Sequence, residues 1–173
     1  MLVVGATRIL RPAVIQLIAE GRTVVGLART EAHLIDLRSE LGEQFSYIAA
    51  DYLDKTLLTE KMRSCSPFDS ALVYAGNAPD AVVRIVSEYV TGPGVEILTS
   101  EAAAKDPDLP FSTDIIAPRL PDHWNALVLG WTADRKWHSP HRISDAAIAA
   151  LRLRVSGQLG HLRPWSDRPR HTQ

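Results

Sequence analysis

Residues 1–11 read MLVVGATRILR, and residues 12–21 continue with PAVIQLIAEG. The apolar run at 1–4 has the length and composition of a buried strand, and the segment after the glycine has the spacing of a helix. A strand that turns at a glycine directly into a helix is typical of the first βαβ unit of a dinucleotide-binding domain. In such a unit the helix N-terminus and nearby backbone N–H groups receive a pyrophosphate. This stretch therefore predicts both a fold and the position of a ligand.

The same alternation continues along the chain. Apolar runs of strand length alternate with segments of helical period. We expect strands at 1–4, 23–28, 45–50, 70–74, 95–99 and 126–130, and helices at 11–20, 31–41, 55–64, 79–90 and 140–155. Alternation with right-handed crossovers predicts an α/β fold, a three-layer, Rossmann-like, doubly wound parallel sheet of about six strands in the order 3-2-1-4-5-6.

A proline-rich segment interrupts this pattern between the fifth and sixth strands. Four prolines exclude a long regular helix there: Pro107, Pro110, Pro118 and Pro121. Long loops inside compact domains often line binding sites. We therefore expect residues 101–123 to lie over the crevice at the carboxyl ends of the strands.

Length and composition predict a single domain, residues 1–157, followed by a basic tail at 158–173. The formal net charge of −1 gives no general reason to expect a nucleic acid or a membrane as partner. No apolar run has the length of a membrane span and no basic leader is present, so a cytoplasmic protein is expected. The single cysteine, Cys65, cannot form an internal disulfide.

The charge is unevenly distributed, because residues 131–173 carry eight Lys or Arg and three acidic residues. No recognised nucleic-acid-binding motif accompanies these charges, so a solvated face is the expected structure. Residues 163–173, within this tail, are expected to be disordered or irregularly docked.

The first turn resembles that of the short-chain dehydrogenase/reductase family, in a shortened and atypical form. Members typically carry Gly-x-x-x-Gly-x-Gly after the first strand, whereas here Gly5 is kept and Ile9 and Arg11 occupy the other two glycine positions. Those glycines let the pyrophosphate approach the backbone and let the helix pack closely on the strand. The two replacements argue against tight cofactor binding.

Two arginines favour a phosphate ligand at the same turn. Arg8 lies within it, and Arg29 directly follows the second predicted strand, which ends without Asp or Glu. The resemblance implies that basic residues at these positions meet the 2′-phosphate of NADP, a group that the guanidinium fork suits well. NADP is therefore the expected cofactor.

Further positions match the family in chain order. Asp51 and Tyr52 follow the third strand, where the resemblance implies a carboxylate bound to the adenine amino group. Ala75 and Gly76 follow the fourth strand, where the family has an Asn-Asn-Ala-Gly turn, and Ser100 closes the fifth at the position of a substrate-orienting serine. The expected cofactor-binding residues are Gly5, Thr7, Arg8, Arg29, Asp51, Tyr52, Ala75 and Gly76.

The catalytic pair of the family is absent. The resemblance would require a Tyr followed four residues later by a Lys that lowers the phenol pKa, and no tyrosine of this chain has that partner. Ser100 and His138 are the remaining catalytic candidates, the latter because histidine titrates near neutrality. No metal is expected, because His138 and His141 supply only two nitrogens.

Three kinds of function stay open. The first is an NADP-linked oxidoreductase that acts on a small carbonyl or related substrate without the usual pair. The second is a cofactor-free enzyme of isomerase or cyclase type on the same scaffold, and the third is a non-catalytic nucleotide-binding or partner subunit. A homodimer is expected by default, because closed two-fold dimers are the commonest assemblies.

Overall fold

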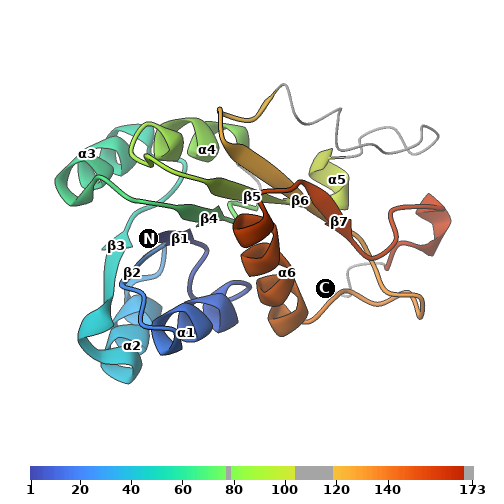
Figure 1. Cartoon of the computed structure of the whole chain (residues 1–173), viewed down its shortest axis with the longest axis horizontal. Coiled ribbons are helices and arrows are strands. Elements are labelled where there is room, and N and C mark those ends of the chain that lie inside the picture. Colours follow the sequence, from blue (N-terminus) through green and yellow to red (C-terminus); the bar gives the residue numbers. More distant parts are fainter. Residues whose placement is uncertain (77–78, 104–118, 170–173) are drawn as a thin grey trace.

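The strands form one parallel sheet with helices on both faces (Figure 1). The computed structural model describes residues 1–76, 79–103 and 119–169. The strands are β1 (Leu2–Val4), β2 (Val24–Ala28), β3 (Phe45–Ala49), β4 (Ala71–Val73), β5 (Gly94–Thr99), β6 (Trp124–Leu129) and β7 (Gly157–Leu159). The α-helices are α1 (Arg11–Ala19), α2 (Glu31–Leu41), α3 (Lys55–Cys65), α4 (Pro79–Ser87), α5 (Ser100–Ala103) and α6 (Pro140–Leu153). Short 3₁₀ turns lie at Gly42–Gln44 and Trp165–Asp167.

The strand order confirms the predicted topology. Within the described residues the order is β3-β2-β1-β4-β5-β6-β7, and all neighbouring strands pair in parallel. The interior strand β1 is buried on both faces, because Leu2, Val3 and Val4 have no exposed surface. Strands β1 to β3 are added toward one edge of the sheet and strands β4 to β7 toward the other, so the strand order reverses between β1 and β4. A doubly wound sheet opens a ligand crevice at such a reversal.

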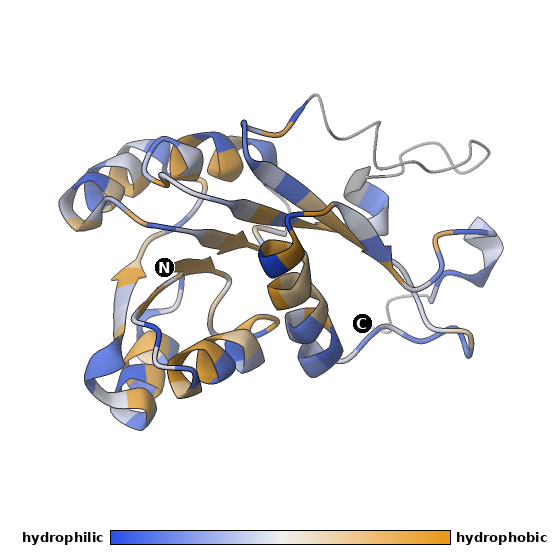
Figure 2. Ribbon diagram, in the orientation of Figure 1, coloured by the Kyte–Doolittle hydropathy of each residue, from blue (hydrophilic) through white to orange (hydrophobic). Residues whose placement is uncertain are grey.

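Two apolar cores lie on opposite faces of the sheet. One holds Val14 of α1, Leu34 of α2 and Ile148 of α6. The other holds Leu58 of α3 and Val82 of α4. Figure 1 shows these two groups of helices on opposite sides of the strands, and Figure 2 shows the strands as largely apolar and the helices as mixed. The period-2 alternation of strand side chains thus supplies both cores from one sheet.

Helix α6 begins where the sequence predicts, and it reaches the first turn. The Ser139 hydroxyl accepts a hydrogen bond from the Arg142 backbone N–H at 3.3 Å, and Pro140 occupies the first helical turn. One turn further on, the buried Ser144 hydroxyl donates to the Ile9 carbonyl at 3.3 Å. This contact ties α6 to the loop between β1 and α1.

The chain after α6 differs from the prediction of a tail at 158–173. Residues Gly157–Leu159 form a seventh strand that pairs with β6, so the sheet continues past the predicted boundary. Beyond it Leu162 is buried, and the ring of Trp165 packs edge-on against that of Trp131 with centroids 6.2 Å apart. The segment was missed because a three-residue strand with one apolar side chain has no readable periodicity.

Most of the proline-rich segment, residues 104–118, lies outside the described residues, so its place over the crevice stays a prediction. In its described part at 119–123, Leu120 packs against the core beneath α4 and against Leu98 and Val128. None of the helices in the described part of the chain is long and apolar enough to span a bilayer.

Candidate functional site

A crevice of about 560 Å³ opens where β1, β2, β3 and β4 end. The carboxyl ends of parallel strands meet at one edge of the sheet, so residues that are far apart in the chain converge there. All eight predicted cofactor-binding residues line this crevice. The remaining lining residues are Ile9, Ala28, Thr30, His33, Leu53 and Tyr74.

Gly5 sets the shape of the turn after β1. Its φ of +83° lies in the region that glycine adopts at no steric cost, and its N–H donates to the Leu27 carbonyl at 2.9 Å. A Cβ added at Gly5 would lie 2.7 Å from the Tyr74 carbonyl oxygen. The bare backbone therefore lets the turn approach the loop after β4, which forms the opposite wall of the crevice.

Replacing Gly5 with alanine is expected to destabilise the fold by about 2 kcal/mol or more, since it adds backbone strain and a steric clash. Gly21→Ala is a matched control, because Gly21 has a φ of +84° but nothing within 4 Å of its added Cβ. Urea unfolding of both variants measures the difference. Equal losses would contradict the close approach between Gly5 and the Tyr74 carbonyl.

Arg8 and Arg29 provide two exposed guanidinium groups at the rim. Among the described residues neither forms a salt bridge, whereas Arg11, Arg22 and Arg152 each pair with a carboxylate. Two uncompensated cations beside the first turn favour an anionic ligand.

The two tyrosines of the crevice are protonated at neutral pH. Burial raises the pKa of Tyr52 to about 12, although the Arg29 charge and a hydrogen bond with the Gly5 backbone oppose the rise. Burial also raises the pKa of Tyr74, and the Arg8 charge opposes it. These shifts are opposite to the lowered phenol pKa that lysine produces in the family. The crevice tyrosines can donate hydrogen bonds, but neither is activated as the missing acid.

Ile9 and Arg11 are separated by the structure. Ile9 lines the crevice and also packs against the core next to α1, so its side chain occupies part of the surface that a glycine would leave open. Arg11 does not line the crevice, because its guanidinium pairs with Glu40 of α2. Of the arginines near the first turn, Arg8 and Arg29 therefore line the crevice and Arg11 does not.

Asp51 and His33 occupy the outer part of the crevice. The Asp51 carboxylate accepts the Leu53 backbone N–H at 3.1 Å, which orients the side chain at the start of the loop after β3. His33 lies in the first turn of α2, and the sequence gave no motif for it. Only the position of His33 in the sequence could have indicated a place in the crevice, since it lies four residues after Arg29 and just past the end of β2.

The two catalytic candidates lie apart from the crevice lining. Ser100 is fully buried at the start of α5, and its hydroxyl has no hydrogen-bond partner among the described residues. His138 packs against Gly160, where an added Cβ would lie 2.3 Å from the His138 Nε2. Burial and the nearby Arg142 charge lower the pKa of His138. No hydrogen bond joins Ser100 to His138 in the described chain, so their catalytic roles stay predictions.

No family model matches the chain, and no curated protein matches it in sequence. Many solved structures share its fold. A serine dehydrogenase from Escherichia coli is 14% identical with a TM-score of 0.67, covering 92% of this chain and 95% of that one. A carbonyl reductase from Pseudomonas aeruginosa PAO1, in complex with NADP, is 16% identical with a TM-score of 0.62, covering 95% and 96%.

A further structure, described as a short chain dehydrogenase/reductase family protein, is 16% identical with a TM-score of 0.69 and covers 92% of this chain and 94% of that one. At these identities the likeness concerns the fold. The chain therefore has the doubly wound, Rossmann-like fold of the short-chain dehydrogenase/reductase structures.

Proposed function

We propose that the crevice binds NADP(H) and that the protein is an atypical oxidoreductase acting on a small carbonyl or related substrate. The observation that carries the proposal is the pair of guanidinium groups, Arg8 and Arg29, that stand without a salt-bridge partner in the described chain at the rim of a Rossmann crevice. NADP differs from NAD by one phosphate on the adenosine ribose, and two free arginines suit that group.

The residues around the rim fit the adenosine end of this cofactor. Strand β2 ends in Ala28 and is followed by Arg29, so no carboxylate is present there to bind a free ribose 2′-hydroxyl. Asp51, held by the Leu53 N–H, would accept from the adenine amino group. Gly5 shapes the turn beside which the phosphates would lie, because its bare backbone lets the loop after β4 approach that turn.

The chemistry at the nicotinamide end of the cofactor depends on fewer residues. Bound nicotinamide would supply a hydride donor or acceptor. Ser100 would orient a substrate carbonyl by donating a hydrogen bond to it, which requires that its hydroxyl, fully buried and outside the crevice lining, become accessible to the substrate. Because Tyr52 and Tyr74 have raised pKa values, we propose no proton transfer through either.

NADPH is expected to stabilise the protein more than NADH does. A ligand that binds only the folded state adds about 2.7 kcal/mol at 100 times its dissociation constant, so the ligand that binds more tightly gives the larger shift in melting temperature at equal concentration. Thermal unfolding of the purified chain with NADPH, with NADH and without a nucleotide measures this. Equal shifts, or none, would contradict the proposed role of the arginines.

A non-catalytic nucleotide-binding protein is the second candidate, favoured by the absent Tyr/Lys pair. Loss of NADPH absorbance with a panel of small aldehydes and ketones separates the two functions. Turnover that falls in Ser100→Ala supports the oxidoreductase. Tight NADPH binding without oxidation by any carbonyl of the panel supports the binding protein.

A further inference from the structure

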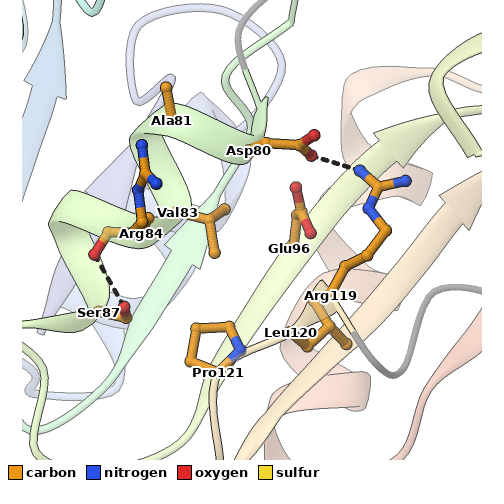
Figure 3. A pocket seen from close by; sticks show the side chains of 9 residues that line it. All are labelled: Asp80, Ala81, Val83, Arg84, Ser87, Glu96, Arg119, Leu120 and Pro121. Carbon is orange, nitrogen blue, oxygen red and sulfur yellow. Dashed lines mark hydrogen bonds and ion pairs between the residues drawn. The ribbon is translucent and has the colours of Figure 1, made fainter.

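A second pocket, of about 630 Å³, lies on the α4 side of the sheet and shares no lining residue with the nucleotide crevice. Figure 3 shows it between α4, strand β5 and the segment that leads into β6. Its lining residues are Asp80, Ala81, Val83, Arg84, Ser87, Glu96, Arg119, Leu120 and Pro121. A volume of this size accommodates a small organic ligand.

Glu96 is the unusual residue of this pocket. It lies within the apolar strand β5, where its neighbours Val95 and Ile97 belong to the core on the opposite face. The residue is only 3% exposed, and its Oε1 atom is buried without a hydrogen-bond partner among the described residues. A buried carboxyl oxygen without a partner is costly, and such a group is rare in a folded protein.

The charges around Glu96 leave it uncompensated. The Arg119 guanidinium forms an ion pair with Asp80 at the start of α4. Figure 3 shows the Glu96 carboxylate beside this pair, with the Arg84 guanidinium pointing away from it. Two carboxyl groups therefore face a single nearby guanidinium, which already binds one of them. The pocket has a place for one further positive charge, or for a proton.

A proton on the Glu96 carboxyl group supplies this positive charge part of the time. Burial raises the pKa of Glu96 to about 7; the Arg119 charge opposes the rise and the Asp80 charge adds to it. The carboxyl group is thus divided between its neutral and charged forms near neutral pH. A cationic donor that binds there would displace the proton and satisfy the buried oxygen.

We propose that this pocket binds a small ligand that carries a primary ammonium group on an apolar body, with the ammonium held by Glu96. An ammonium group supplies three N–H donors, which suits an unpartnered carboxyl oxygen beside a second carboxylate. Val83, Leu120 and Pro121 provide apolar surface for the rest of the ligand. A bare metal ion is disfavoured, because no group of three or more metal-binding side chains occurs in the described chain.

The direct test is a titration of the full chain with pentylammonium chloride, followed by the backbone amide shifts of the isotopically labelled protein. Saturable shifts at Ala81, Val83 and Leu120 are expected. Glu96→Gln is expected to weaken binding at least tenfold, whereas Glu88→Gln, which changes an exposed carboxylate just after α4, should leave it unchanged. Pentanol and pentanoate, with the same apolar chain and no positive charge, should bind far more weakly.

The pH dependence tests the proposal without a substitution. The alkylammonium keeps its charge between pH 6 and pH 8, whereas Glu96, whose pKa is raised to about 7, changes its protonation over this range. With a pKa near 7 its ionised fraction rises about tenfold over this range, and the affinity for pentylammonium should rise by a similar factor. Absence of saturable binding, a flat pH dependence, or tighter binding of pentanoate would each overturn the proposal.

Discussion

Replacing Arg8 and Arg29 together with alanine is expected to weaken NADPH binding by about 100-fold and to remove the preference over NADH. A hydrogen bond to a charged group contributes about 1.5 to 3 kcal/mol, and 1.4 kcal/mol corresponds to a factor of ten. Both side chains are exposed, so solvent screening reduces the sum and we take the lower end. Binding of NADH, which lacks the 2′-phosphate, should change little.

Isothermal titration of the wild-type and variant proteins at one fixed salt concentration measures both affinities. Arg11→Ala is the matched control, since Arg11 carries the same charge on the same segment but pairs with Glu40 outside the crevice. If Arg11→Ala lowered NADPH affinity as much as the double variant, a general effect of positive charge would explain the binding. An unchanged NADPH preference in the double variant would also exclude the proposed contacts.

Trp131→Ala is expected to cost about 3 to 5 kcal/mol of unfolding free energy, the range for large aromatic side chains removed from a core. Trp131 is 1% exposed and packs edge-on against Trp165. Its backbone also exchanges two hydrogen bonds with His161, at 3.0 and 2.7 Å. The indole therefore joins the end of β6 to the segment that follows β7.

Urea unfolding of Trp131→Ala beside Leu153→Ala gives the comparison, because the Leu153 side chain is 69% exposed and its removal should cost less than about 0.5 kcal/mol. Far-UV circular dichroism of both variants reports whether the fold is retained. A loss below about 1 kcal/mol at Trp131 would mean that the chain beyond β7 is not packed against the sheet in solution.

The crevice at the ends of β1, β2, β3 and β4 was predictable because its position follows from topology. Gly5, Arg29, Asp51 and Gly76 each follow a different parallel strand, and the strand ends of a doubly wound sheet converge at one edge. Apolar runs and helix-start signals such as Ser139-Pro140 located the elements that hold these residues. Local patterns were therefore sufficient where the geometry of the parallel sheet brings the residues after each strand to one edge.

Other features depend on contacts that no local pattern records. Strand β7 is stabilised by backbone pairing with β6, which the sequence Gly157–Leu159 does not reveal. The separation of His138 from the crevice follows from its packing against Gly160, far along the chain. Glu96 did carry a signal, a single acidic residue within an apolar strand, but only the structure shows that its Oε1 lacks a partner among the described residues.

The most direct test of the central claim uses ligands that contain only the adenosine end of the cofactor, so that contact between Ile9 and the rest of the cofactor does not affect the result. Isothermal titration should compare 2′,5′-ADP with 5′-AMP, which differ only in the 2′-phosphate assigned to Arg8 and Arg29. We predict saturable binding of 2′,5′-ADP with an affinity at least about tenfold above that of 5′-AMP, equivalent to about 1.4 kcal/mol. Equal affinities, or no binding of either compound, would contradict the assignment of this crevice to NADP.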